Sequence, residues 1–135
     1  MTDNGPMPFV TNIEKATVEN DTYRSTLWTG KYLQVTVMSI LPGDDIGLEV
    51  HEDHDQFLRI EKGSGTVHMG PAEDDMKQLP AADDDAIFVP AGLWHNVVNT
   101  GDVPLKVYSI YSPPEHAHGT VHVTKADADA AEHAH

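Results

Sequence analysis

Two short segments of the chain carry side chains of the kinds that bind metal ions. One holds Glu49, His51 and Gln56, and the other holds His95. Side chains alternate along a β-strand, so Glu49 and His51 are expected on the same face. If the inward faces of the two segments converge, two imidazoles, a carboxylate and a carboxamide meet inside an apolar barrel. Nitrogen and oxygen donors without sulfur suit a first-row divalent ion such as Mn, Fe, Co, Ni or Zn.

The elements that must position these residues are short strands separated by turns. Strands are predicted at residues 23–28, 32–40, 47–52, 56–61, 65–69, 76–79, 86–89, 94–99 and 104–111, with glycine and proline in the breaks. Thr124 is expected to cap a short helix over 125–132. Strands of this length and spacing predict an all-β antiparallel sandwich or barrel.

The composition of the chain excludes several classes of partner. Its 135 residues include 22 acidic and 8 basic side chains and no cysteine, for a formal charge of −14. So few cations cannot form the basic face that nucleic acid or an anionic membrane requires. Without cysteine there is no disulfide, thiolate nucleophile or cysteine-type metal site. The acidic clusters at 44–45, 74–75 and 83–85 indicate solvated turns or, as an alternative, adaptation to high salt.

The beginning of the chain shows no secretory signal. It lacks a basic stretch followed by an apolar one, and the longest apolar runs are far too short to span a bilayer. We therefore expect a cytoplasmic protein.

The second of the two segments resembles a motif of the cupin superfamily. Pro90-x-Gly92-x-x-His95-x-x-x-Asn99 matches that motif from its proline onward, whereas Asp84 stands where the motif opens with glycine. The resemblance implies that His95 is a metal ligand.

The first segment resembles the other cupin motif with two substitutions. Glu49 and His51 fall at its two histidine positions, and Gln56 falls at its glutamate position. The ligand set that the resemblance implies is therefore Glu49, His51, Gln56 and His95. Both substitutions keep an oxygen donor, but the amide of Gln56 is neutral.

The wider resemblance is to small single-domain cupins that are often labelled mannose-6-phosphate isomerase-like. It is carried by residues 49–65 (EVHEDHDQFLRIEKGSG) and 89–122 (VPAGLWHNVVNTGDVPLKVYSIYSPPEHAHGTVH). It implies a single jelly-roll barrel that forms a homodimer. The isomerase label is a fold-level analogy, and the scarcity of lysine and arginine counts against a phosphosugar substrate.

Each candidate residue also has a second interpretation. His51 and His95 could be core histidines satisfied by local hydrogen bonds. Glu49 could be a structural carboxylate, or a base beside the metal. Gln56 is either a direct ligand or a donor that orients His51. His54 lies in an acidic turn and is expected to be exposed, with a ligand role as the alternative.

The predicted organisation is a flexible N-terminus (1–10), a cupin barrel (11–114) and a C-terminal arm or tail (115–135). The arm contains His116, His118 and His122. These are expected to be mobile surface histidines. The alternative is a second metal site, or a lid over the mouth of the barrel.

The function expected from the sequence is that of a metal-dependent enzyme acting on a small, oxygen-rich molecule. A metal held by two histidines and a carboxylate serves isomerisation of a sugar-like substrate, and a redox metal also serves dioxygenation. Glu49 or a bound water is the expected base. One alternative is a cupin that binds a small ligand or a structural metal without turnover, and another is a storage or structural cupin.

Overall fold

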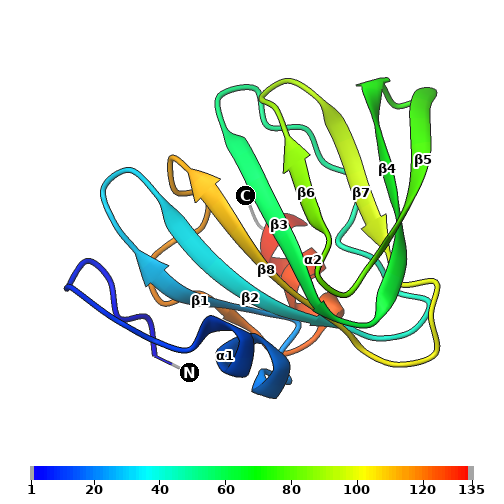
Figure 1. Cartoon of the computed structure of the whole chain (residues 1–135). Coiled ribbons are helices and arrows are strands. Elements are labelled where there is room, and N and C mark those ends of the chain that lie inside the picture. Colours follow the sequence, from blue (N-terminus) through cyan, green and yellow to red (C-terminus); the bar gives the residue numbers. More distant parts are fainter. Residues whose placement is uncertain (1, 134–135) are drawn as a thin grey trace.

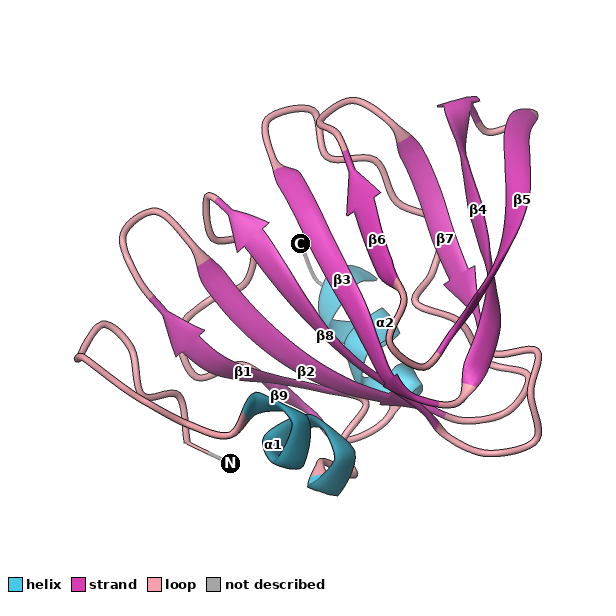
Figure 2. Ribbon diagram, viewed as in Figure 1, coloured by secondary structure: helices cyan, strands magenta, loops and turns pink. Residues whose placement is uncertain are grey.

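The structure, a computed structural model, describes residues 2–133 and consists mainly of strands (Figure 2). The strands are β1 (Arg24–Thr29), β2 (Gln34–Ile40), β3 (Asp55–Lys62), β4 (Ser64–Ala72), β5 (Asp75–Ala82), β6 (Ala86–Val89), β7 (Trp94–Val98), β8 (Leu105–Ser112) and β9 (Val121–His122). The helices are α1 (Ile13–Glu19) and α2 (Lys125–His133). The predicted all-β fold with a short C-terminal helix is confirmed.

The strands form two antiparallel sheets that face each other across the core (Figure 1). The six-stranded sheet has the order β6-β3-β8-β2-β1-β9, and the three-stranded sheet has the order β5-β4-β7. Because β8 lies between β2 and β3, strands far apart in the sequence are neighbours in the larger sheet. This arrangement is a small jelly-roll barrel.

The apolar core lies between the two sheets. Leu58, Ile60, Leu105 and Val107 of the larger sheet are fully buried. Val67 and Val97 of the smaller sheet belong to the same cluster. Complete burial of one such side chain contributes roughly 1.5–3 kcal/mol, so this core fixes the relative position of the two sheets.

Helix α1 lies on the outer face of the larger sheet and has no counterpart in the predicted elements. Asn12 caps it, because the Asn12 side-chain oxygen accepts from the backbone N–H of Lys15 at 3.0 Å. Its apolar residues Ile13 and Ala16 pack against a second buried cluster made of Leu27, Val37 and Tyr108. Burial against the sheet therefore stabilises a helix that is too short to persist alone.

The predicted strand at 47–52 is wrong. Between β2 and β3 the chain makes only isolated bridges, Asp45 to Val98 and Glu49 to His95. Gly47 has a φ of 90°, which interrupts extended backbone at this point. Glu49 and His51 are therefore positioned by a bridge and loop contacts rather than by the alternation of a strand.

The C-terminal arm, defined here as residues 115–133, is tied to the larger sheet by the fully buried Gln34. The Gln34 amide donates to the carbonyl of His116 at 2.7 Å. Its side-chain oxygen accepts from the backbone N–H groups of Glu115 and His116 at 3.1 and 2.8 Å. Beyond this anchor, β9 pairs with β1, placing His122 opposite Arg24.

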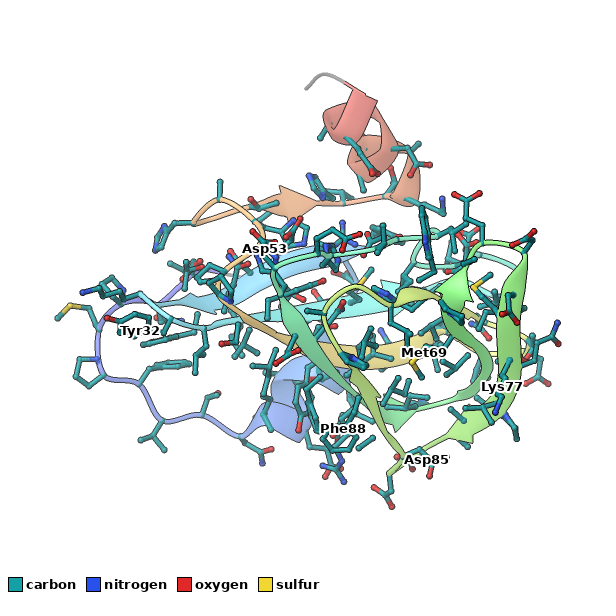
Figure 3. All side chains as sticks on the ribbon, turned by 90° about the horizontal axis from the view of Figure 1, so that it is seen from above. Tyr32, Asp53, Met69, Lys77, Asp85 and Phe88 are labelled. Carbon is teal, nitrogen blue, oxygen red and sulfur yellow. The ribbon has the colours of Figure 1, made fainter. Side chains whose placement is uncertain are left out.

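Helix α2 begins where the sequence predicts. The backbone N–H of Asp127 donates to the Thr124 hydroxyl at 3.1 Å, and the backbone N–H of Thr124 donates to the Asp127 carboxylate at 3.2 Å. This reciprocal pair is a capping box. In Figure 3, α2 and the arm lie on the opposite side of the molecule from the labelled Phe88 and Asp85.

The turn before β6 contains a residue in an unusual conformation. Asp84 has a φ of 75°, a left-handed value that side chains other than glycine rarely adopt. Its carboxylate accepts from the Arg59 guanidinium at 3.0 Å. The place where the cupin motif has glycine therefore needs left-handed backbone here as well.

Within residues 2–133, no helix has the length and apolar character needed to cross a membrane. The predicted boundaries between N-terminus, barrel and arm remain predictions, and residues 1, 134 and 135 lie outside the described part of the chain.

Candidate metal centre and its cavity

Glu49, His51 and His95 converge on one point inside the barrel. The Glu49 carboxylate lies 3.0 Å from Nε2 of His51 and 3.8 Å from Nε2 of His95. One ligand atom from each of the three residues lies within 4.8 Å of the others. This spacing brings two imidazole nitrogens and a carboxylate oxygen close enough to share one metal ion.

Backbone contacts between the two motif segments hold these side chains together. Glu49 and His95 exchange both backbone hydrogen bonds, each 2.9 Å long. Nearby, the backbone N–H of Gly92 donates to the carbonyl of His51 at 2.8 Å, and Gly92 has a φ of 84°. Gly92 thus allows the turn that brings the second motif into contact with the first.

His95 faces hydrogen-bond acceptors on both sides of its ring. Its Nδ1 lies 3.2 Å from the carbonyl oxygen of Leu93, and its Nε2 lies 3.0 Å from Oε1 of Gln56. Burial lowers the pKa of His95, so the ring is neutral and carries one N–H. With the Gln56 amide oriented as in this structure, one nitrogen therefore presents a lone pair to an oxygen, a contact that a cation would relieve.

Glu49 and His51 form a charged pair. Burial acts to raise the pKa of Glu49, but the hydrogen bond with His51 and the charges of Arg24 and His51 outweigh it and leave the pKa below its ordinary value. The hydrogen bond with Glu49 raises the pKa of His51 despite burial. The ion pair holds the carboxylate ionised, which is the state that binds a metal.

Gln56 does not orient His51, which corrects one of its two predicted roles. Its side-chain oxygen contacts His95 instead, and the residue is 4% exposed. The carboxylate beside Nδ1 of His51 belongs to Glu115, at 3.6 Å. Glu115 comes from the arm, so an orienting group for a barrel histidine is supplied by a segment outside both motifs.

His54 is not exposed as expected. Its side chain is 13% exposed, and its Nε2 lies 3.3 Å from the Glu115 carboxylate. His51, His54 and Glu115 form a second group whose ligand atoms are close enough to hold a metal. His51 belongs to both groups, so a metal ion could be held either with Glu49 and His95 or with His54 and Glu115.

A cavity of about 500 Å³ opens beside the metal-ligand group. Glu49 and His51 line one wall, and Arg24, His116 and His122 line another. The three residues of this second wall each have a buried side-chain nitrogen without a hydrogen-bond partner in the described structure: Arg24 Nε, His116 Nε2 and His122 Nδ1.

The expectation that the arm histidines are surface residues is wrong for His116. Its ring packs edge-on against Tyr111 at 5.3 Å, and burial lowers its pKa to about 3. The side chain of His118, by contrast, is 55% exposed. The alternation of buried and exposed positions in the arm follows its anchoring by Gln34, which the composition of the arm does not indicate.

Some other singled-out residues have structural roles. The Asn99 amide donates to the carbonyls of Ile40 and Val103, both at 2.8 Å, and so closes a loop rather than contributing to the site. Phe88 is 69% exposed and lies outside the core of this chain. Trp94 lines the cavity.

A family model described as a cupin domain matches residues 36–111, more than half of the chain. The chain belongs to this family. It is similar to the protein YrkC of Bacillus subtilis (strain 168), with 62% identity over 131 residues that cover 96% of this chain and 70% of YrkC.

Two solved structures extend the comparison. The crystal structure of BH2720 from Bacillus halodurans matches with a TM-score of 0.95 and 60% identity, covering 96% of this chain and 99% of that one. A structure described as a predicted oxalate decarboxylase from Thermotoga maritima matches with a TM-score of 0.55 and 26% identity, covering 62% of this chain and 69% of that one.

Sequence reasoning missed Arg24 and Glu115 as residues of the site. Neither lies in a motif, and each reaches the cavity through long-range pairing of strands or through the Gln34 anchor. The available signal was the rarity of arginine, since Arg24 and Arg59 are the chain's two arginines.

Proposed function

We propose that Glu49, His51, Gln56 and His95 bind a first-row divalent cation, and that the chain uses it to act on a small, oxygen-rich molecule. Mn, Fe, Co, Ni and Zn all suit the donor set. The observation that carries the proposal is the convergence of Glu49, His51 and His95, whose ligand atoms lie within 4.8 Å of one another. A cation at Nε2 of His95 would leave Nδ1–H of the ring to donate to the carbonyl of Leu93.

The chain's own residues have distinct tasks in this proposal. His95 and His51 present Nε2 to the site, while the Leu93 carbonyl accepts from Nδ1 of His95 and the Glu115 carboxylate lies 3.6 Å from Nδ1 of His51. A bound divalent ion would supply polarisation of a substrate oxygen, and a redox-active one would add dioxygen chemistry. Glu49, ionised at neutral pH, either completes the ligand set or accepts a proton from the substrate.

The adjoining cavity supports a small-molecule substrate. Its volume of about 500 Å³ falls within the range of sites for small ligands, and Glu49 and His51 of the proposed ligand set line it. The similarity to a structure described as a predicted oxalate decarboxylase also supports a small, oxygen-rich substrate. Isomerisation and dioxygenation both remain within this proposal.

The alternative function is binding without turnover. The feature that favours it is Gln56, because a neutral amide in place of a carboxylate weakens the site for a divalent ion. Turnover that rises in proportion to bound metal would exclude this alternative. Loss of thermal stability on chelation, without turnover of any substrate in a sugar and diketone panel, would support it.

The predicted homodimer also belongs to the proposal. An apolar surface formed by the exposed Phe88 and Pro90 and the partly exposed Phe57 and Ile110 supports it, because such a patch favours association with a second copy. Sedimentation analysis of the wild type and of Phe88→Glu tests it. A wild type that is monomeric at all concentrations contradicts it. The cytoplasmic location stays a prediction.

Elemental analysis after purification without added metal tests the metal site. We expect about one equivalent of metal in the wild type and none in the His51→Ala/His95→Ala double variant. His68→Ala is the matched control, because His68 lies on β4 opposite Asn96 and takes part in neither of the candidate ligand groups. Full metal content in the double variant would refute the proposal.

A further inference from the structure

The two arginines of the chain have opposite surroundings. Arg59 lies on the outer surface and pairs with Glu61 at 2.9 Å and Asp84 at 3.0 Å. Arg24 is 6% exposed and lines the cavity. Within residues 2–133 no carboxylate lies at salt-bridge distance from it, and its Nε has no hydrogen-bond partner. The charge of Glu49 acts on this guanidinium without a direct ion pair, so the unpaired Nε–H still carries the cost of its burial.

The arginine is held in place by contacts that do not use its side-chain N–H groups. Its backbone is fixed in β1 opposite His122 of β9, and its guanidinium carbon lies 5.3 Å from the centre of the Tyr23 ring. Neither contact uses an N–H group of the side chain. A guanidinium is a rigid fork of donors that matches the two oxygens of a carboxylate or phosphate.

Two imidazoles beside Arg24 have the same deficit. His116 Nε2 and His122 Nδ1 are buried and have no partner among the described residues. Burial, reinforced by the positive charge of Arg24, lowers the pKa of both rings, so both are neutral and each can donate one N–H. The three residues that carry these unpaired nitrogens thus line the same cavity as Glu49 and His51.

We propose that Arg24, His116 and His122 bind an oxyanion group of the small molecule whose other oxygens reach the metal site. The substrate is then an acid, and the anion site fixes its orientation with respect to Glu49, His51 and His95. This inference rests on the proposed function for the position of the rest of the molecule. The oxyanion site itself stands on the three unpaired nitrogens.

The charges around the cavity favour a carboxylate over a phosphate. Glu115 and Glu132 also line the cavity, and Glu115 contacts His51 and His54 rather than Arg24. A singly charged carboxylate meets less repulsion from these acids than a doubly charged phosphate does. Both share the geometry that the arginine fork recognises, so the experiment separates them.

The test observes the arginine Nε–H group directly by nuclear magnetic resonance. Arg24 and Arg59 are expected to give two Nε–H signals, and Arg59→Gln assigns them by removing one. Glycolate, ethylene glycol and inorganic phosphate are titrated into the metal-free and zinc-loaded protein. We expect glycolate to shift the Arg24 signal, phosphate to shift it more weakly, and neutral ethylene glycol and the Arg59 signal to show no change.

Variants then separate recognition from folding. Arg24→Lys keeps the charge but loses the fork, and we expect it to weaken glycolate binding by at least about tenfold. Arg24→Met keeps the apolar stem, and we expect it to abolish binding with little loss of melting temperature, because removing the desolvation cost of the guanidinium offsets the loss of its attraction to Glu49. A structural arginine would give a large drop in melting temperature instead.

The outcomes distinguish this inference from the metal proposal. An Arg24 signal that stays unmoved by both anions, or moves equally with ethylene glycol, overturns it even if the protein holds metal. A shift caused by phosphate alone overturns the carboxylate assignment. A shift in a protein that binds no metal keeps the oxyanion site and removes the proposed metal function.

Discussion

The two walls of the cavity differ in how their polar groups are satisfied. On the barrel wall, formed by Glu49 and His51, the two side chains contact each other, and Glu49 also lies 3.8 Å from Nε2 of His95, which does not itself line the cavity. On the arm wall, formed by His116 and His122 of the arm together with Arg24 of β1, each residue has a buried nitrogen without a partner in the described structure. The barrel wall therefore offers mainly hydrogen-bond acceptors and lone pairs, whereas the arm wall offers N–H donors.

The difference teaches that a segment with a recognisable motif and a segment without one can form complementary halves of one site. Acceptors and lone pairs that converge suit a cation, whereas donors that converge suit an anion. A small acid that offers neutral oxygens at one end and a carboxylate at the other meets both requirements. The two walls can be tested separately, by substituting residues on one wall and measuring the effect on the other.

The largest effect is expected from releasing the arm. Gln34→Ala removes the buried anchor of Glu115 and His116 and should lower the free energy of unfolding by about 2–4 kcal/mol, because several buried backbone groups lose their partner. Urea denaturation measures the loss, and hydrogen exchange should rise in residues 115–122 while metal content is retained. Gln78→Ala, at an exposed position on β5, is the control. Equal stability of the two variants would contradict the anchoring role.

Removal of metal acts on the barrel wall alone and should have the next largest effect. A metal at about 100 times its dissociation constant stabilises the folded protein by roughly 2.7 kcal/mol, so chelation should lower the melting temperature by several degrees. The His51→Ala/His95→Ala variant should not respond. Calorimetry with and without chelator makes the measurement, and an identical response of variant and wild type would exclude a site at these residues.

A smaller effect is expected at Gln56. Gln56→Leu removes the oxygen beside His95 Nε2 and should weaken metal binding by about tenfold. Gln56→Glu keeps an oxygen donor and adds charge, so it should bind metal at least as tightly as the wild type. Isothermal titration with zinc compares the three proteins. Unchanged affinity in Gln56→Leu would place Gln56 outside the ligand set.

The smallest effect, taken per pH unit, is the dependence of the free energy of unfolding on the protonation of His116. Between its ordinary value of 6.5 and its lowered pKa of about 3, the unfolded chain holds a proton on His116 that the folded chain lacks. Acidification through this window therefore destabilises the protein, by about 1.4 kcal/mol per pH unit at most. His51, whose pKa is raised, acts in the opposite direction.

The contribution of His116 is isolated by comparing the metal-free wild type with metal-free His116→Gln. Denaturant titrations at successive pH values should give a flatter dependence below pH 6.5 in the variant. Parallel curves for the two proteins would mean that the buried ring does not resist protonation.

The sequence predicted most strands and the residues of the barrel wall because both depend on local signals. Turn residues separate the strands, and the spacing of His51 and His95 follows motifs whose ends are linked by backbone bonds. The predicted strand at 47–52 failed because Gly47 breaks the backbone where alternation of side chains would have continued. A local pattern of side chains predicts their positions correctly only where the backbone keeps the conformation that the pattern assumes.

The arm wall could not be predicted because it depends on contacts across the fold. His116 is buried because Gln34, 82 residues earlier, binds its backbone and Tyr111 packs against its ring. Arg24 reaches the cavity because β1 lies between β2 and β9 in the larger sheet, which places Arg24 opposite His122. Helix α1 was missed for the same reason, since its stability comes from packing against the larger sheet.

The left-handed backbone at Asp84 has a consequence for how sequences of this kind vary and are compared. The position selects residues by conformation, so glycine, aspartate and asparagine are interchangeable there at little cost, whereas a β-branched residue is excluded. Aspartate adds a carboxylate that engages Arg59, a gain that glycine cannot offer. A search that demands the glycine letter overlooks chains that meet the same requirement with a different side chain.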